Sequence, residues 1–101
     1  MRLVQVRDGP AIRTLLERHG LAASPLELAR LARFDPRRRM VICASTLLDA
    51  TETIVGLAAI ELDASEPDFL FVDAALTQEL RDLLTRALVG RAHEIADRRA
   101  A

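Results

Sequence analysis

The chain contains no lysine, tryptophan or tyrosine, and all 14 of its basic residues are arginine. Without a side-chain amine it cannot form a Schiff base, and it lacks the lysine that phosphate-binding loops use. Aldolase-like, pyridoxal-dependent and P-loop functions are therefore excluded. Phenylalanine is the only aromatic residue, with three copies. Because single-stranded nucleic acid is usually bound by several stacked aromatics, we do not expect such a surface.

A strong charge of either sign is also missing, since 14 basic residues face 15 acidic ones. This balance gives no general attraction to nucleic acid or to an anionic membrane. Cys43 is the only cysteine, so no intramolecular disulfide can form. The N-terminus has no apolar signal region, and the longest apolar runs, 40–48 and 54–60, are far shorter than the ~20 residues that span a bilayer. We therefore predict a cytoplasmic protein.

The composition predicts one folded domain over residues 1–101, because half of the residues are hydrophobic. Alternation at Leu3–Val6 predicts a short first strand. Asp8–Pro10 is a helix-start signal, and apolar residues at helical spacing follow it as far as Gly20, a left-handed stop. Ser24–Glu27 fits a capping box that begins a second helix, which should end by Phe34.

The second half of the chain predicts three strands and a long helix. Met40–Leu48 and Ile54–Leu62 are nearly continuous apolar runs joined by a polar loop, which favours a hairpin buried on both faces. Phe69–Val72 is a third apolar strand. From Thr77 onward, apolar residues recur at helical spacing and predict a helix packed on the sheet. These residues are Leu80, Leu83, Leu84, Ala87, Leu88, Ala92 and Ile95.

The predicted elements follow the order strand, helix, helix, strand, strand, strand, helix, which resembles the first half of the GNAT N-acetyltransferase fold over roughly residues 3 to 96. Three local patterns also resemble that fold. They are Val6–Asp8, Ile54–Ala58, and Phe71–Asp73 before a leucine-rich helix. The resemblance implies an α/β (α+β) domain of β-α-α-β-β-β-α order, with a mainly antiparallel sheet and helices on both faces. The family's fifth strand, the helix after it and its last strands would lie beyond Ala101, so we expect a truncated GNAT-like domain.

The resemblance also implies where a cofactor would lie. In the family, a glycine-containing turn before the central helix holds the pyrophosphate of acetyl-CoA, which places Val72, Thr77 and Gln78 here as cofactor-binding candidates. The corresponding stretch 73–81 has no glycine. The carboxylates of Asp73 and Glu79 complement the helix dipole themselves and should repel a pyrophosphate.

Glu61 occupies the neighbourhood where such acyltransferases often place a general base, and it is the candidate catalytic residue. The alternative is a strand-end carboxylate in solvent. Cys43 lies within an apolar strand and is expected in the core. His19 ends a helix, where an imidazole suits the dipole, and His93 has no i+4 histidine partner, so no metal site is expected. Arg37–Arg39 could hold an anion or form a solvated loop.

The functional expectation follows from the sheet edge. If the strands follow the family order, Phe69–Val72 is an apolar edge strand that lacks a fifth strand, and self-association or a partner protein should cover it. We therefore expect a non-catalytic GNAT-like module that forms a homo-oligomer. One alternative is an acetyl-CoA-dependent N-acetyltransferase completed by oligomerisation. Another is a ferredoxin-like small-ligand regulatory domain.

Overall fold

A four-stranded antiparallel sheet forms the centre of the molecule in a computed structural model that describes residues 1–20, 31, 37–48, 50–61 and 63–100. In sheet order, its strands are β1 (Arg2–Leu3), β2 (Arg39–Leu48), β3 (Thr51–Glu61) and β4 (Phe69–Val72). The α+β class and the antiparallel sheet predicted from the sequence are confirmed. The sheet order follows the chain order. Short connections join β2, β3 and β4, whereas α1 lies in the long connection between β1 and β2.

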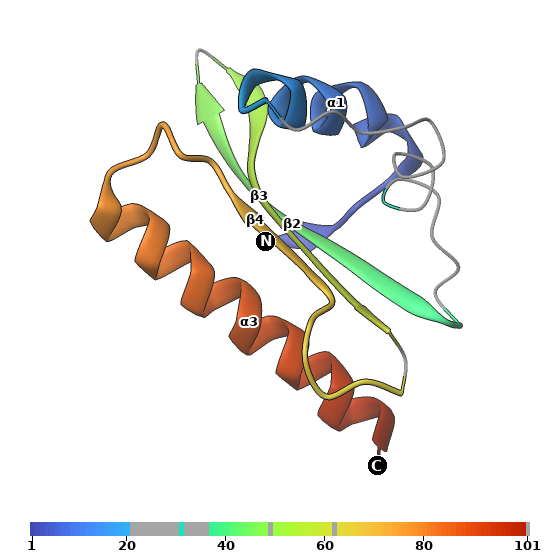
Figure 1. The fold of residues 1–101 in the computed structure, drawn as a ribbon. Coiled ribbons are helices and arrows are strands. Elements are labelled where there is room, and N and C mark those ends of the chain that lie inside the picture. Colours follow the sequence, from blue (N-terminus) through green and yellow to red (C-terminus); the bar gives the residue numbers. More distant parts are fainter. Residues whose placement is uncertain (21–30, 32–36, 49, 62, 101) are drawn as a thin grey trace.

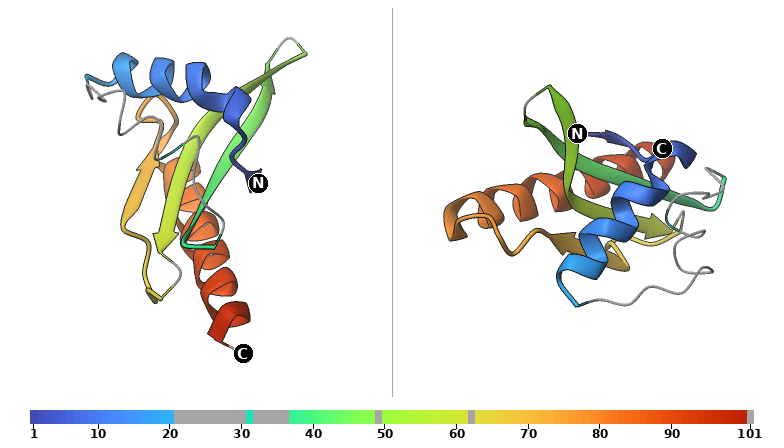
Figure 2. Two further views of the ribbon diagram at one scale, coloured as in Figure 1. Left: turned by 90° about the vertical axis from the view of Figure 1, so that its right-hand side faces the viewer. Right: turned by 90° about the horizontal axis from the view of Figure 1, so that it is seen from above.

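Two long helices cover opposite faces of this sheet (Figures 1 and 2). α1 (Gly9–Arg18) lies across one face, and α3 (Gln78–Ala100) runs along the other. The predicted helix start at Asp8–Pro10 and the stop at Gly20 are confirmed, the latter with a φ of 73°. The second helix predicted between Ser24 and Phe34 lies, apart from the helical Leu31, outside the described residues.

The predicted first strand is present, but its extent over Leu3–Val6 is wrong, because β1 contains only Arg2 and Leu3. A 3-10 turn, η1 (Val6–Asp8), follows it. The Asp8 carboxylate accepts the N–H of Gln5 at 2.6 Å and also binds Arg2, which folds the chain back before the strand can continue. Local side-chain bonds of this kind compete with strand formation.

β2 and β3 form a long hairpin, as predicted, but β3 starts at Thr51 and not at Ile54. Ala44 pairs with Gly56 while Ser45 pairs with Ile54, so Val55 is an extra residue, a β-bulge. Strand side chains normally alternate between faces. At the bulge, Ile54 packs on the side of the sheet that α1 covers and Val55 on the side that α3 covers. Gly56 also faces α3, next to Leu88.

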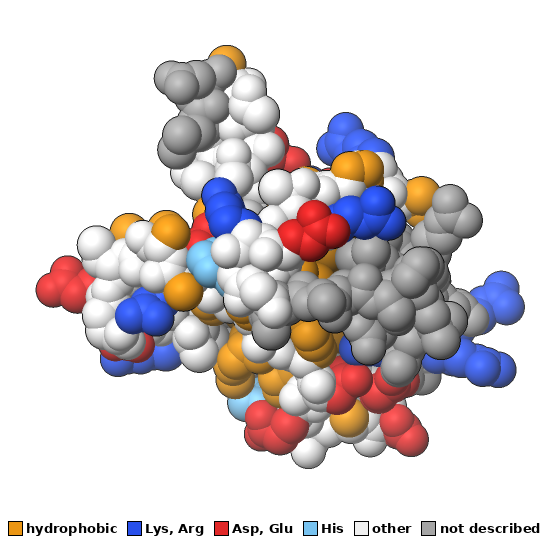
Figure 3. Space-filling view, turned by 45° about the horizontal axis from the view of Figure 1, so that its top comes forward, with side chains coloured by type: hydrophobic (Ala, Val, Ile, Leu, Met, Phe, Trp, Pro, Cys, Tyr) orange, Lys and Arg blue, Asp and Glu red, His pale blue; other side chains and the backbone are white. Residues whose placement is uncertain are grey.

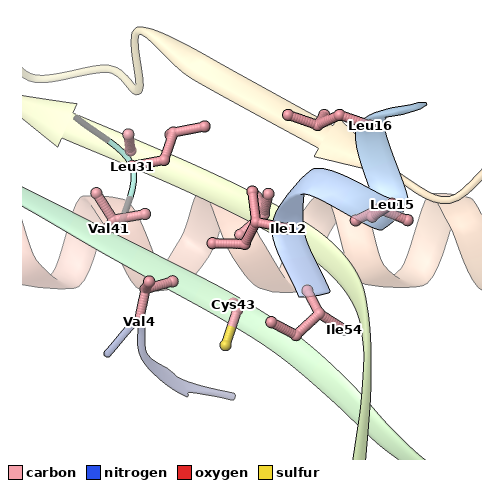
Figure 4. Close-up of a cluster of buried hydrophobic side chains, with 10 residues drawn as sticks. Val4, Ile12, Leu15, Leu16, Leu31, Val41, Cys43 and Ile54 are labelled. Atoms are coloured by element: carbon pink, nitrogen blue, oxygen red, sulfur yellow. The ribbon is translucent and has the colours of Figure 1, made fainter. Parts of the chain in front are cut away.

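The core has two parts, one on each face of the sheet. The α1-face cluster (Figure 4) contains Val4, Ile12, Leu15, Leu16, Leu31, Val41, Cys43, Ile54, Leu57 and Ala59, with Phe69 and Phe71 packed against it. The α3-face cluster contains Ile42, Ala44, Val55, Ala58 and Leu88, with Val72, Leu76, Leu84 and Ile95 beside it. Cys43 is buried as predicted, and this burial raises the pKa of its thiol. Cys43 is therefore a core residue, and a raised thiol pKa disfavours the reactive thiolate.

One part of the prediction for α3 is wrong. Leu84, Leu88 and Ile95 pack on the sheet, but Leu80 is 47% and Leu83 61% exposed. Each residue advances about 100° around a helix axis. Leu83 therefore points well away from the line of Leu84 and Leu88, and apolar spacing alone overestimates the buried face.

Candidate functional site

Glu61, the predicted general base, ends β3 in a mixed-charge group. Its carboxylate lies 4.0 Å from Arg39, and its side chain is 40% exposed. Arg39 also binds Asp68 at 3.1 Å, so Arg39 of the arginine run joins the start of β2 to the turn before β4. Glu61 thus has a partner that the sequence did not reveal, and its catalytic role stays a prediction.

The cofactor-binding candidates lie around the start of α3. Val72 ends β4 and packs with the α3-face cluster. The Thr77 hydroxyl accepts the N–H of Leu80 at 3.3 Å, which makes Thr77 the N-terminal cap of the helix. The Gln78 amide donates to Asp82 at 2.8 Å and accepts from Arg81 at 2.6 Å. The polar groups of Thr77 and Gln78 are therefore used within α3 itself.

Glu61 does not lie near these candidates. The turn after β4 begins beside Val55, whose carbonyl accepts the N–H of Asp73 at 2.8 Å. Glu61 follows Val55 by six positions on β3, and six residues of extended strand span about 20 Å. The structure places the predicted base and the predicted cofactor turn at opposite ends of the β3 and β4 pairing.

A polar group that the sequence did not predict joins the end of α1 to the turn after β4. We call it the His19–Asp73 cluster, and it consists of Arg18, His19, Phe71, Asp73 and Ala75. Asp73 accepts from His19 Nε2 at 2.6 Å, from Arg18 at 2.9 Å and from the Ala75 N–H at 2.9 Å. The His19 ring also packs on Phe71, with ring centres 5.6 Å apart.

The electrostatics of the cluster keep the buried Asp73 ionised. Burial disfavours the charged carboxylate, but the Ala75 N–H, His19 and Arg18 together outweigh it and lower the pKa of Asp73. The Asp73 carboxylate is therefore paired with the Arg18 guanidinium and is not an unpaired negative charge at the start of α3. Of the two carboxylates expected to repel an anion there, only Glu79 has no ion pair within the described part of the chain.

A second charged group connects three elements near the start of α1. Both Asp8 oxygens accept from Arg2, at 2.8 and 2.9 Å, and Glu52 on β3 binds the same guanidinium. The Ser45 hydroxyl donates to Glu52 at 3.1 Å. Arg2 lowers the pKa values of Asp8 and Glu52, so both stay ionised. This group has the geometry of a structural clamp between β1, the η1 turn that precedes α1, and the hairpin.

A shallow groove of about 290 Å³ lies between α1 and the first residues of β3. It is lined by Pro10, Ala11, Thr14, Leu15, Arg18, Glu52, Thr53 and Ile54. Around α1 acidic and basic side chains are interspersed, without a large area of one sign (Figure 3). Within the described part of the chain, no three His, Cys, Asp or Glu side chains are arranged to hold a metal ion.

In comparisons with known proteins, no family model matches the chain, and no curated protein or solved structure matches it significantly. None of the helices in the described ranges is both long and apolar enough to cross a membrane. A functional proposal therefore depends on what the sheet, its edges and its polar clusters can do.

Proposed function

We propose that this chain is a non-catalytic GNAT-like module that acts by association along the β4 edge. The observation that carries the proposal is the position of β4. In the described part of the sheet, β4 pairs with β3 on one side and with no strand on the other. Leu70, in the middle of β4, is 41% exposed. An apolar edge of this kind is normally covered, and this one contains neither lysine nor proline to blunt it.

The GNAT-like part of the proposal is supported by the arrangement of the elements. The resemblance implies consecutive antiparallel strands, two helices after the first strand and a long helix after the fourth. The order β1, α1, β2, β3, β4, α3, with α1 and α3 on opposite faces, supports this part of the proposal, while the second of the two early helices falls almost entirely outside the described residues. Shared architecture does not by itself carry an activity, so the catalytic question depends on the site.

The non-catalytic part is supported by the two groups of candidate residues. Glu61 is bound near Arg39, about 20 Å along β3 from the turn that would hold a cofactor. At that turn Thr77 caps α3, Gln78 bonds within the helix, and residues 73–81 offer no glycine for close approach of a phosphate. These residues do not fit a pyrophosphate cradle.

Light scattering on the purified chain tests the association. We expect a dimer at micromolar concentration and a monomer for Leu70→Lys, because a charge on the exposed strand opposes edge pairing. Leu47→Lys is the matched control, since Leu47 is 74% exposed at the hairpin end and away from β4. It should leave the dimer unchanged. A wild-type chain that stays monomeric at every accessible concentration contradicts the proposal.

A thermal-shift titration with acetyl-CoA tests the competing enzyme function. We expect no change in melting temperature at millimolar cofactor. A ligand at about 100 times its dissociation constant stabilises a protein by ~2.7 kcal/mol, which such a titration detects easily. A clear rise would favour the alternative of an acetyl-CoA-dependent N-acetyltransferase completed by oligomerisation.

A further inference from the structure

The backbone polar groups of β4 point in two directions. Asp73 donates its N–H to Val55 of β3, and paired residues of antiparallel strands alternate between bonded and non-bonded pairs. By this alternation, Phe71 opposite Leu57 and Phe69 opposite Ala59 direct their N–H and C=O groups toward β3. The N–H and C=O groups of Leu70 and Val72 therefore point out of the sheet.

These outward groups have a two-fold arrangement. A second copy of β4, laid antiparallel with Phe71 opposite Phe71, sets Leu70 opposite Val72 of the second copy and Val72 opposite its Leu70. Both pairs are then hydrogen-bonded pairs, and every outward backbone group of the strand has a partner. We infer that two copies pair in this register and form one continuous antiparallel sheet. The inference rests on the proposed self-association and specifies its geometry.

The other symmetric registers satisfy fewer groups. Centring the pair on Leu70 would need Asp68 to face outward, but its N–H bonds inward to the Ala59 carbonyl at 3.0 Å. Centring it on Val72 would need Ala74 to continue the strand, and Ala74 lies in a turn. Only the register centred on Phe71 keeps both hydrogen-bonded pairs within Phe69–Val72.

The charges that flank β4 are compatible with a second copy. Asp68 at its start binds Arg39 at 3.1 Å, and Asp73 at its end binds Arg18 at 2.9 Å. Without these ion pairs, two copies would bring four uncompensated carboxylates to one interface. In the register centred on Phe71, Asp68 faces Ala74 and Asp73 faces Phe69, so no like charges are directly opposite.

The side chains also suit this register. Phe71 opposite Phe71 is a non-hydrogen-bonded pair, in which Cα atoms lie about 4.5 Å apart and aromatic side chains interact favourably. Symmetry of this kind gives a closed dimer in which the same residues serve both copies. It also extends the antiparallel sheet without leaving β4 exposed.

Disulfide trapping in a Cys43→Ala background tests the register. We expect Phe71→Cys to form a crosslinked dimer under mild oxidation, because the Cα separation falls in the range of disulfides. Leu70→Cys alone and Val72→Cys alone should crosslink weakly. An equimolar mixture of these two variants should crosslink, since the two positions face each other. The mixture keeps Phe71 in place, so it also serves if Phe71→Cys folds poorly.

The outcomes separate the register from the association itself. Efficient crosslinking of Leu70→Cys alone, or no crosslinking in any variant that light scattering shows to be dimeric, overturns the register and leaves self-association standing. A monomeric background protein overturns both. Crosslinking by the mixture together with weak crosslinking by its separate components supports the inference.

Discussion

Nε2 of His19 lies 2.6 Å from Oδ1 of Asp73, and this contact joins the residue after α1 to the residue after β4. The two residues are 54 positions apart in the chain. Arg18 binds the other carboxylate oxygen, and Phe71 packs against the imidazole. The contact therefore connects α1 to the edge of the sheet at the point where the chain leaves β4 for α3.

Asp73→Asn should destabilise the protein by about 2 kcal/mol, because hydrogen bonds to a charged group contribute more than neutral ones. Asparagine can still accept the Ala75 N–H but cannot match the charge of Arg18. Urea denaturation followed by circular dichroism measures the change. Asp68→Asn is the control, since that half-exposed carboxylate pairs with Arg39 and should cost less than ~1 kcal/mol. Equal losses for the two variants would contradict a special role for Asp73.

The protein should lose stability in acid through Asp8 and Asp73. The hydrogen bonds from Arg2 lower the pKa of Asp8, and the contacts of Asp73 outweigh its burial and lower its pKa too. A lowered pKa in the folded state means that the stabilisation is present above the pKa of the unfolded chain, near pH ~4, and is lost as pH falls through the folded value. Urea midpoints measured between about pH 6 and about pH 2 should fall.

Asp8→Asn and Asp73→Asn should each flatten this acid dependence, because each removes one titrating group. Their midpoints should converge with that of the wild type at the lowest pH, where the native carboxylates are protonated as well. Glu79→Gln controls for the loss of one negative charge at an exposed position. A wild-type midpoint that is constant across this range would refute the assignment of acid sensitivity to these residues.

Leu88→Ala should destabilise the protein by about 3 kcal/mol, since it removes a fully buried side chain from the α3-face cluster and leaves a cavity. Leu83→Ala on the same helix should change stability by less than ~0.5 kcal/mol, because Leu83 is largely exposed. Thermal or urea unfolding distinguishes the two. A large loss for Leu83→Ala would mean that this side chain is covered in solution.

Gly56→Val should cost about 2 kcal/mol through overpacking. A Cβ atom at Gly56 would lie 3.0 Å from the Leu88 side chain and 3.6 Å from the Cβ of Ala44, so the Leu88 side chain or the helix would have to shift to admit valine. Gly90→Ala should instead stabilise α3 by about 0.5 to 1 kcal/mol, because nothing lies within 4 Å of a Cβ there. Differential scanning calorimetry of both variants checks the opposite signs.

Much of the architecture could be predicted from local patterns. The continuous apolar runs correctly indicated the hairpin of β2 and β3, and Pro10 and Gly20 marked the limits of α1 because both residues act through the backbone. The first strand was predicted to extend too far, because the Asp8 side chain binds Arg2 and the Gln5 N–H and these local bonds end the strand early. Leu80 and Leu83 were assigned to the buried face because periodicity does not show how wide that face is.

The polar clusters could not be predicted in the same way. His19 at a helix end and Asp73 after a strand each had an ordinary local explanation, and only the packing of α1 beside β4 brings them together. The same holds for Arg2 and Glu52, which lie 50 positions apart. The resemblance to the GNAT fold identified Glu61 and Thr77 as candidates, but the position of one relative to the other depends on strand register.

The bulge at Val55 determines how the hairpin tolerates changes in length. Ile54 and Leu57 are an odd number of positions apart and still share the α1 face, because Val55 takes up one position outside the ladder. Deleting Val55 would restore simple alternation and keep Ile54 on the α1 face and Glu52 beside Arg2. Deleting Thr53 instead would turn Glu52 to the opposite face and break its bond to Arg2. Deleting Val55 should thus preserve the contact between Arg2 and Glu52, whereas deleting Thr53, two positions earlier, should break it.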